Sequence, residues 1–287
     1  KYTDEGVTPP KRVWNMKTHN AETYGTNVLN AMIGKRFNYP KSLYAVQDTL
    51  RFFVANKPNA LIVDFFAGSG TTLHAVNLLN AEDGGHRRCI LVTNNEVSAD
   101  EAKTLSAQGY QPGDPEWEQY GIARYVTWPR TVCSIEGHDV NGNPLKGDYI
   151  TSGEEPMHMA DGFKANAAFF KLGFLDKNAV ALGRQFKELL PVLWLKAGAH
   201  GPCPSLEEAA EVPAMLVLPE NHFAVLTDES QYETFATQVN IEDAITTVYI
   251  VTDSEPGYRE MISGLHAEDT YQLYRDYLDN FRINTGR

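Results

Sequence analysis

The clearest fold signal in the sequence is VDFFAGSGTTLHAVNLLN, residues 63–80. It begins within the apolar run ALIVDFF, which is typical of a short strand buried on both faces. The apolar spacing from Thr71 to about Ala81 predicts a helix. Between the two, Gly68-Ser69-Gly70 predicts a tight turn that leaves backbone amide groups open to a ligand. The stretch therefore indicates a strand, a binding loop and a helix, with a phosphate or a carboxylate as the bound group.

The second strand of this unit narrows the class of ligand. RRCILVTNNE, residues 87–96, predicts a buried strand, so strand, helix and strand form a βαβ unit with parallel pairing. Glu96 ends that strand, where a carboxylate can accept hydrogen bonds from the hydroxyl groups of a ribose. A solvated carboxylate at a strand end is the alternative interpretation. Gly70 is followed by Thr71-Thr72 rather than by lysine, and Leu73 replaces the third glycine of the dinucleotide fingerprint. A nucleoside ligand with little phosphate fits, and S-adenosylmethionine fits best.

The remaining pattern predicts an α/β chain with a boundary near residue 154. Upstream, a weak helical pattern covers 26–33 and a clearer one covers about 40–55. A hairpin is predicted between YVTWP (125–129) and YITSG (149–153). Beyond the boundary we expect strands over 163–170, 214–219, 222–228 and 246–253 and a helix over 178–198. The domains are then 1–154 and 155–287, the second being a smaller α/β module.

Composition bounds the class of protein. The chain has 287 residues, 43% of them hydrophobic, and a formal net charge of −12. No apolar run approaches the ~20 residues that span a bilayer, so no membrane partner is expected. Cys89, Cys133 and Cys203 show no paired spacing, which argues against disulfides and zinc and fits a reducing cytoplasm. Residues 1–60 carry nine Lys and Arg against four Asp and Glu, so a polyanion would meet this segment first.

Several other residues could be catalytic or metal-binding, but a structural role explains each of them better. Asp228 and Asp253 each follow a predicted strand and suggest a metal or nuclease pair, yet helix capping by Asp228 and by Asp253 or Ser254 explains them better. His200 and Cys203 lack a third partner for nucleophilic catalysis. The remaining candidates, better explained as packing residues, are His74, Trp14, Tyr24 and Phe37.

The segment DFFAGSGTTLHAVNLLNAEDGGHRRCILVTNNE resembles the S-adenosylmethionine-binding segment of amino-methylating DNA methyltransferases. Within these it is most similar to the modification subunit of type III restriction systems. VWNMKTHNAETYGTNVLNAMIGKRFNYPKS is similar to the stretch that precedes this motif in the same family. The resemblance covers roughly residues 10–97 and extends only loosely to the tail YQLYRDYLDNFRIN. It implies a partial Rossmann-like methyltransferase sheet with S-adenosylmethionine as cofactor.

The resemblance also assigns roles to residues. Asp64 should orient the loop and approach the amino end of the cofactor, Thr71 and Thr72 should cap the helix, and Glu96 should hold the ribose. Phe65 stands where many relatives have proline. The other cofactor-contacting positions are Lys41 and Ser42 in the upstream turn and Phe66, Ala67, Gly68 and Gly70 in the wall and turn of the loop.

The catalytic motif of that family, Asp/Asn-Pro-Pro-aromatic, is missing from the sequence. The Pro-Pro pair in VTPPKR has Thr8 before it and Lys11 after it, so neither the acceptor nor the stacking aromatic is present. We therefore expect the C-terminal, cofactor-binding portion of a DNA adenine methyltransferase, which meets DNA in the complete enzyme and is inactive alone. An alternative is a non-catalytic module that docks a restriction subunit or a second copy of the chain. A methyltransferase for another substrate, with a diverged catalytic motif, is a third option.

Overall fold

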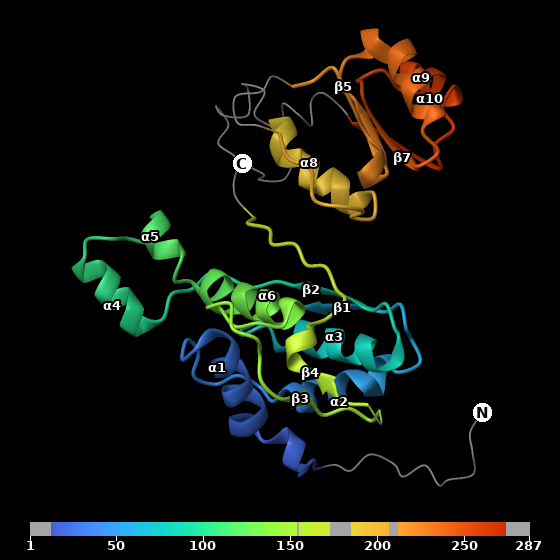
Figure 1. Cartoon of the computed structure of the whole chain (residues 1–287). Helices are drawn as coiled ribbons and strands as arrows, with labels where there is room; N and C mark the ends of the chain where they lie inside the picture. The colour runs from blue at the N-terminus through green and yellow to red at the C-terminus, as the bar shows by residue number, and fades with distance from the viewer. Residues whose placement is uncertain (1–12, 154, 173–184, 207–211, 274–287) are drawn as a thin grey trace, which may run out of the picture. The chain divides into compact units, whose positions relative to one another are not determined.

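The computed structural model describes residues 13–153, 155–172, 185–206 and 212–273. The chain forms two compact units, 1–169 and 170–287 (Figure 1). The division lies beyond the predicted boundary because the segment after residue 154 packs on the first unit: Phe163 stacks on Tyr149 and donates its amide to the carbonyl of Ile135 at 3.0 Å. The Pro-Pro pair at 9–10, the first residues of the helix predicted over 178–198 and most of the tail that resembles the family lie outside the described residues.

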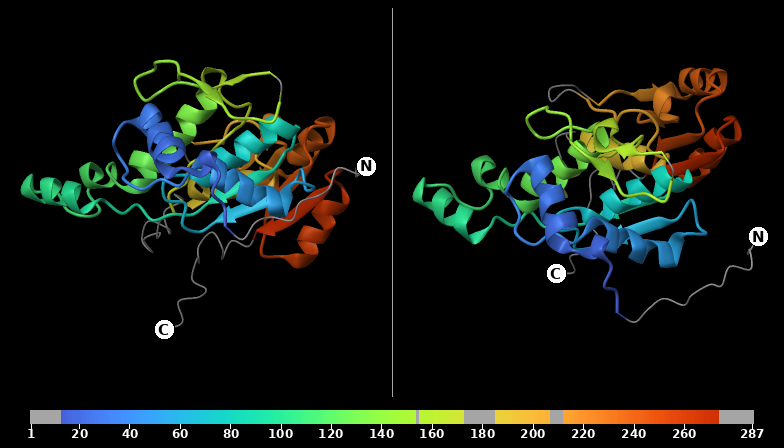
Figure 2. Two further views of the ribbon diagram at one scale, coloured as in Figure 1. Left: turned by 90° about the horizontal axis from the view of Figure 1, so that it is seen from below. Right: turned by 60° about the horizontal axis from the view of Figure 1, so that its bottom comes forward.

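The first unit is mainly helical, with one small parallel sheet. Its short 3₁₀- and π-helical turns are Lys17–His19, Glu22–Thr26, Ala123–Thr127 and Met159–Asp161. Its helices are α1 Asn27–Ile33, α2 Leu43–Val54, α3 Thr71–Asp83, α4 Ala99–Ala107, α5 Pro115–Glu118 and α6 Trp128–Glu136. Its strands are β1 Leu61–Asp64, β2 Arg88–Leu91, β3 Asp148–Tyr149 and β4 Met157–His158. Two further views show α4 and α5 standing away from the rest of the unit (Figure 2).

The βαβ unit forms where the sequence predicts it. β1 and β2 pair in parallel with Val63 opposite Ile90, and α3 ends at Gly84, whose φ of 70° is the left-handed conformation that glycine adopts readily. The expectation that both faces of these strands are buried is wrong. Leu61, Val63, Ile90 and Val92 are 45–51% exposed, because α3 covers one face and no described element of the first unit covers the other. The mixed α/β class is confirmed, whereas a Rossmann-like sheet stays a prediction.

Two further expectations for this unit are wrong. YVTWP is not a strand, because the π-helical turn Ala123–Thr127 leads directly into α6 with Pro129 in its first turn. YITSG therefore finds another partner, and β3 pairs with β4. Residues 163–170 form no regular strand. The helices predicted around 26–33 and 40–55 are confirmed as α1 and α2.

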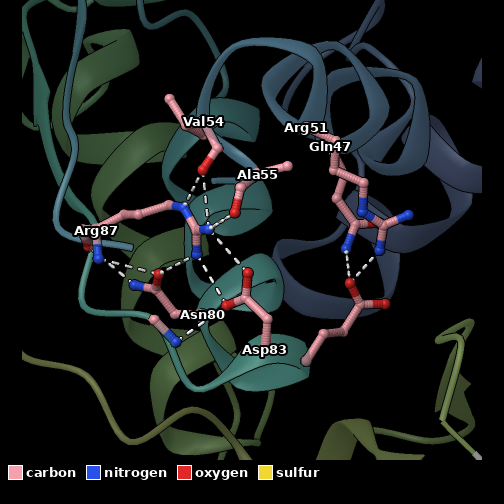
Figure 3. Close-up of polar contacts among 9 residues, drawn as sticks. Gln47, Arg51, Val54, Ala55, Asn80, Asp83 and Arg87 are labelled. Atoms are coloured by element: carbon pink, nitrogen blue, oxygen red, sulfur yellow. Dashed lines mark hydrogen bonds and ion pairs between the residues drawn. The ribbon is translucent and has the colours of Figure 1, made fainter. Parts of the chain in front are cut away.

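A buried arginine joins the end of α2 to the end of α3 (Figure 3). The guanidinium of Arg87 donates to the carbonyls of Val54 and Ala55, at 2.9 Å and 3.1 Å from Nη2, and to the carboxylate of Asp83. These carbonyls lie at the C-terminal end of α2, where the helix itself supplies no N–H group to bond them. The bond from Arg87 holds the pKa of Asp83 below its ordinary value. Arg87 therefore supplies hydrogen-bond donors to the C-terminal carbonyls of α2 and forms an ion pair with Asp83 of α3.

A second polar contact fixes the same pair of helices nearer the middle of α2. Gln47 donates to the carboxylate of Glu82 at 2.9 Å, and Arg51 pairs with the same oxygen (Figure 3). Arg51 also reaches Asp48, whose other oxygen lies 2.8 Å from His19. The two helices are thus held by charge as well as by apolar packing.

The second unit is a three-layer α/β structure. Its helices are α8 Gln185–Lys196, α9 Tyr232–Ile241 and α10 Glu255–Ser263, with 3₁₀ turns at Pro219–Asn221 and Glu229–Gln231. Its strands are β5 Met215–Leu218, β6 Phe223–Leu226, β7 Thr247–Val251 and β8 Asp269–Leu273, in that order across the sheet. β5 is antiparallel to β6, and the rest are parallel. α8 covers one face and α9 with α10 the other (Figure 1).

The capping interpretation of the second unit is confirmed. Asp228 accepts the amide of Ser230, and Ser254 accepts that of Gly257 at the start of α10, where Pro256 lies in the first turn. In the part of the chain that the structure describes, no three His, Cys, Asp or Glu side chains gather as a metal site, and the three cysteines are free. No helix among these residues is long and apolar enough to cross a membrane.

Replacing Arg87 should destabilise the first unit. The change Arg87→Met leaves the terminal carbonyls of α2 and the Asp83 carboxylate without their partner, so the free energy of unfolding should fall by roughly 3 kcal/mol. Urea unfolding followed by hydrogen exchange in α2 and α3 measures this fall. Arg88→Met is the matched control, because the neighbouring Arg88 is exposed. Equal stability of the two variants would contradict the assigned role of Arg87.

Candidate cofactor-binding site

The glycine loop between β1 and α3 adopts backbone conformations that require glycine. Gly68 and Gly70 have φ of +52° and +75°, in the left-handed region. Gly70 is the N-cap of α3, and its amide donates to the carbonyl of Ala67 at 2.8 Å, which closes the turn. A Cβ at Gly70 would lie 3.2 Å from Cγ2 of Thr127, so the position is restricted by space as well as by backbone conformation.

The turn leaves several backbone amides without a partner. Within the described residues, the N–H groups of Gly68, Ser69, Thr71 and Thr72 make no hydrogen bond. These groups lie at the N-terminus of α3, where the helix dipole places a partial positive charge. Such amides can bind an anionic or carbonyl oxygen of a ligand.

Asp64 closes the loop from the strand side. One carboxylate oxygen accepts the amide of Phe66 at 3.0 Å and the other accepts the hydroxyl of Thr72 at 2.6 Å. The end of β1 is thereby tied to the first turn of α3. Thr71 and Thr72 do not cap the helix as expected, because Gly70 occupies the N-cap position and both hydroxyls bond elsewhere.

Residues just before α6 and within it support the loop from a second side. The hydroxyl of Thr127 lies 2.5 Å from the carbonyl of Gly68 and 3.1 Å from that of Ile122. Arg130 donates from Nη1 to the hydroxyl of Thr71 at 2.7 Å and to Oγ of Ser69 at 3.1 Å. Arg130 is fully buried. The loop conformation therefore depends on groups about sixty residues further along the chain.

His74 lies beneath the first turn of α3 as a neutral packing residue. Nε of Arg130 donates to its Nδ1 at 3.4 Å, so Nε2 carries the proton toward the hydroxyl of Tyr149 at 2.9 Å. Burial, aided by the charge of Arg130, lowers the pKa of His74 well below its ordinary value. A base role for His74 has no support, and the packing interpretation is confirmed.

The residues between Asp64 and the turn divide by exposure. Phe65 and Phe66 are 67% and 90% exposed, so their rings are available to a ligand or to another segment. Ala67 is buried and donates its amide to the carbonyl of Val92 beside β2 at 3.2 Å. Of the two wall residues predicted from sequence, Phe66 is open and Ala67 is structural, and the ring of Phe65 is open beside them.

Glu96 lies in the extended stretch after β2. Its side chain is exposed, with one oxygen 3.4 Å from the amide nitrogen of Asn94. Its backbone carbonyl accepts the amide of Ile122, and the neighbouring Asn95 bonds the backbone of Glu118 and Arg124. The carboxylate is thus exposed, while the backbone of Glu96 is fixed.

The upstream turn contains Lys41, whose side chain is exposed, and Ser42, whose hydroxyl is already hydrogen-bonded within the protein. Lys41 is exposed. Ser42 is buried, accepts the amide of Ala45 as the N-cap of α2 and donates to the carbonyl of Thr18 at 2.8 Å. The turn is pressed against Gly25, where a Cβ would lie 2.6 Å from the carbonyl of Pro40.

The aromatic residues near the front of the unit are mainly packing groups, as expected. Tyr24 and Phe37 pack against the core of the first unit. Trp14 stacks on Phe52 with ring centroids 5.1 Å apart.

Sequence reasoning missed Thr127 and Arg130. The turn-rich stretch between YVTWP and YITSG predicts a hairpin, and that prediction places Thr127 in a strand and Arg130 directly after it. The Trp128-Pro129 pair was the available signal, because proline is frequent in the first turn of a helix.

Residues 1–104 match the family model described as DNA methylase. The chain is 34% identical over 102 residues to the type III restriction-modification enzyme EcoPI Mod subunit of Escherichia phage P1, covering 36% of this chain and 15% of that protein. It is 41% identical over 86 residues to the type II methyltransferase M.KpnI of Klebsiella pneumoniae, covering 30% and 20%. It is 34% identical over 212 residues to the type III StyLTI Mod subunit of Salmonella typhimurium, covering 67% and 31%.

These similarities confirm the resemblance to amino-methylating DNA methyltransferases of the type III modification kind. The matched family segment includes β1, the glycine loop, α3 and β2. The similarity to the StyLTI subunit is longer than that segment. The chain spans less than a third of the length of each of these relatives.

His74 makes the stability of this site depend on pH. Its pKa is lowered on folding, so the unfolded chain binds the proton more readily and stability is lost as pH falls below about 6.5. The loss should approach about 1.4 kcal/mol per pH unit in the wild-type chain and should be absent from His74→Gln. Urea unfolding between neutral pH and pH about 5.5 measures the slope.

His86→Gln is the matched control for that experiment, because His86 is exposed and close in sequence. It should keep the wild-type slope. A wild-type slope in His74→Gln would show that the buried imidazole is not the titrating group.

Proposed function

From the match of residues 1–104 to the DNA methylase family, we propose that this chain is the C-terminal, cofactor-binding portion of a site-specific adenine DNA methyltransferase. The complete enzyme would transfer a methyl group from S-adenosylmethionine to the adenine amino group of DNA within a restriction-modification system. The observation that carries the proposal is the glycine loop, whose open amides at Gly68 and Ser69 lie between β1 and α3.

The residues present fit S-adenosylmethionine. The open amides and the N-terminus of α3 suit the carboxylate of its amino-acid end. Glu96, exposed beyond β2, suits the ribose hydroxyls. The exposed rings of Phe65 and Phe66 offer apolar surface beside the loop. In the upstream turn, Lys41 is available, whereas the hydroxyl of Ser42 is used by α2.

The exposed face of the β1–β2 sheet supports the view that the chain works within a larger enzyme. Leu61, Val63 and Ile90 together with Val92 form an apolar face on two strands, and apolar surface of this kind is favourable to bury. We infer that an upstream segment carrying the Asp/Asn-Pro-Pro-aromatic motif packs on this face. Such a segment would supply the acceptor and the stacking ring that the sequence lacks.

DNA and a restriction subunit are the partners that this function requires. The basic character of residues 1–60 suits a segment near DNA phosphates. The relatives of the EcoPI and StyLTI kind are Mod subunits of type III restriction-modification enzymes, so a restriction subunit is the protein partner that we propose.

A non-catalytic assembly module is the second candidate. The similarity to the StyLTI Mod subunit covers 212 residues and so extends beyond the family segment. In this alternative, the second unit docks a restriction subunit or a second copy of the chain, and the glycine loop has lost its ligand. Cofactor binding separates the two candidates.

Binding of S-adenosylhomocysteine, measured by calorimetry, tests the cofactor site. Gly70→Ala should lower the affinity at least about tenfold, because alanine strains the left-handed turn and crowds Thr127. Gly84→Ala is the matched control: it has φ of +70° at the other end of α3, with open space around it, and should keep wild-type affinity. Absence of binding to the wild-type chain would favour the assembly module.

Methyl transfer tests the assignment as a portion of an enzyme. The chain alone should transfer no labelled methyl group to mixed-sequence DNA, and addition of the upstream segment in trans should restore transfer. Val63→Asp, on the exposed sheet face, should abolish this restoration without unfolding the chain.

Ile241→Asp, at an exposed apolar position of the second unit, is the control and should complement normally. Robust transfer by the isolated chain, or normal complementation by Val63→Asp, would contradict the proposed arrangement.

A further inference from the structure

Arg130 holds a positive charge beneath the glycine loop without a negative partner. Its side chain has no exposed surface. Burial lowers its pKa to about 10, so the guanidinium is charged at neutral pH. Its contacts are neutral groups of Ser69, Thr71 and His74. Across the described ranges it forms no ion pair, and its Nη2 has no hydrogen-bond partner.

The comparison with Arg87 makes this environment unusual. Arg87 is also buried, but the Asp83 carboxylate and the last carbonyls of α2 surround its charge. A buried charge without a counter-ion destabilises a fold. A charge of this kind beside a binding loop indicates that a ligand supplies the missing negative group.

The charge lies where it adds to the field of α3. Nη1 of Arg130 is 3.3 Å from the carbonyl of Ser69 and 2.7 Å from the hydroxyl of Thr71, the first residue of α3. The helix N-terminus and the guanidinium therefore act on the same loop with the same sign. The low dielectric of a buried site strengthens this effect relative to that of a surface arginine.

We propose that Arg130 is a positioning residue that selects ligands carrying a carboxylate at the glycine loop. The inference rests on the proposed function, in which the carboxylate belongs to the amino-acid end of S-adenosylmethionine. Arg130 acts through the loop: it fixes Ser69 and Thr71, whose amides face the ligand, and its charge favours the anionic end of the ligand over a neutral one.

The test compares two ligands that differ only in the carboxylate. S-adenosylhomocysteine and its decarboxylated analogue, which keeps the amino group, are bound in turn to the full chain by calorimetry. The selectivity is the ratio of the two dissociation constants. In Arg130→Gln this selectivity for the carboxylate should fall by about tenfold, whereas Arg130→Lys, which keeps the charge, should stay within about threefold of wild type.

Arg87→Gln is the matched control, because it also removes a buried arginine of the same unit. It should leave the selectivity at the wild-type value. Ser69→Asp keeps Arg130 and places a carboxylate beside its Nη1, so it should lower the selectivity even where Arg130→Gln fails to fold.

The outcomes separate the inference from the function on which it rests. If Arg130→Gln lowers the affinity for both ligands by the same factor, Arg130 is only a structural support and the inference is overturned. Binding of the ligands by the wild-type chain would still leave the proposed function standing. Unchanged selectivity in Ser69→Asp would overturn it too. A wild-type chain that binds neither ligand would overturn the proposed function and the inference together.

Discussion

The left-handed turn at Gly70 lets a short loop, residues 65–70, connect β1 to α3, and the organisation of the first unit follows from it. Glycine relieves the steric cost of this backbone but loses more conformational entropy than other residues on folding. That loss is offset by groups from separate elements: Asp64 from β1, Thr127 before α6 and Arg130 within α6. Each bonds the loop itself or the first residues of α3. The backbone amides of the loop that have no hydrogen-bond partner are therefore held in fixed positions by these contacts.

Local sequence signals were sufficient for the elements on either side of this turn. The apolar runs and the glycines at both ends of α3 predict β1, α3 and β2, because each signal acts within a few residues. The support from Thr127 and Arg130 was not predictable in this way. The sequence predicts a hairpin for their segment, whereas the structure continues a π-helical turn into α6. The contacts of this segment with the loop join residues about sixty positions apart, which no local pattern reports.

The exposed face of β1 and β2 has a related physical cause. An apolar run predicts that both faces of a strand are buried, but it does not identify the segments that cover them. α3 covers one face, and Val63 and Ile90 remain open on the other. In the second unit, the equally apolar β6 and β7 are covered on both faces by helices of the same unit. Similar apolar runs are therefore covered on both faces in one sheet and on one face in the other.

The division between held and open groups at the loop bears on how a ligand would bind. The backbone is fixed before binding, so the main chain contributes little ordering cost when a ligand arrives. The rings of Phe65 and Phe66 are exposed, and their side-chain freedom would be lost only on contact. The fixed backbone amides of the loop would set the position of a charged group of the ligand, whereas the exposed aromatic rings can adapt to the rest of the ligand. This arrangement suits the ligand that we propose, an amino acid joined to a nucleoside, which has one charged end and one flat, less polar end.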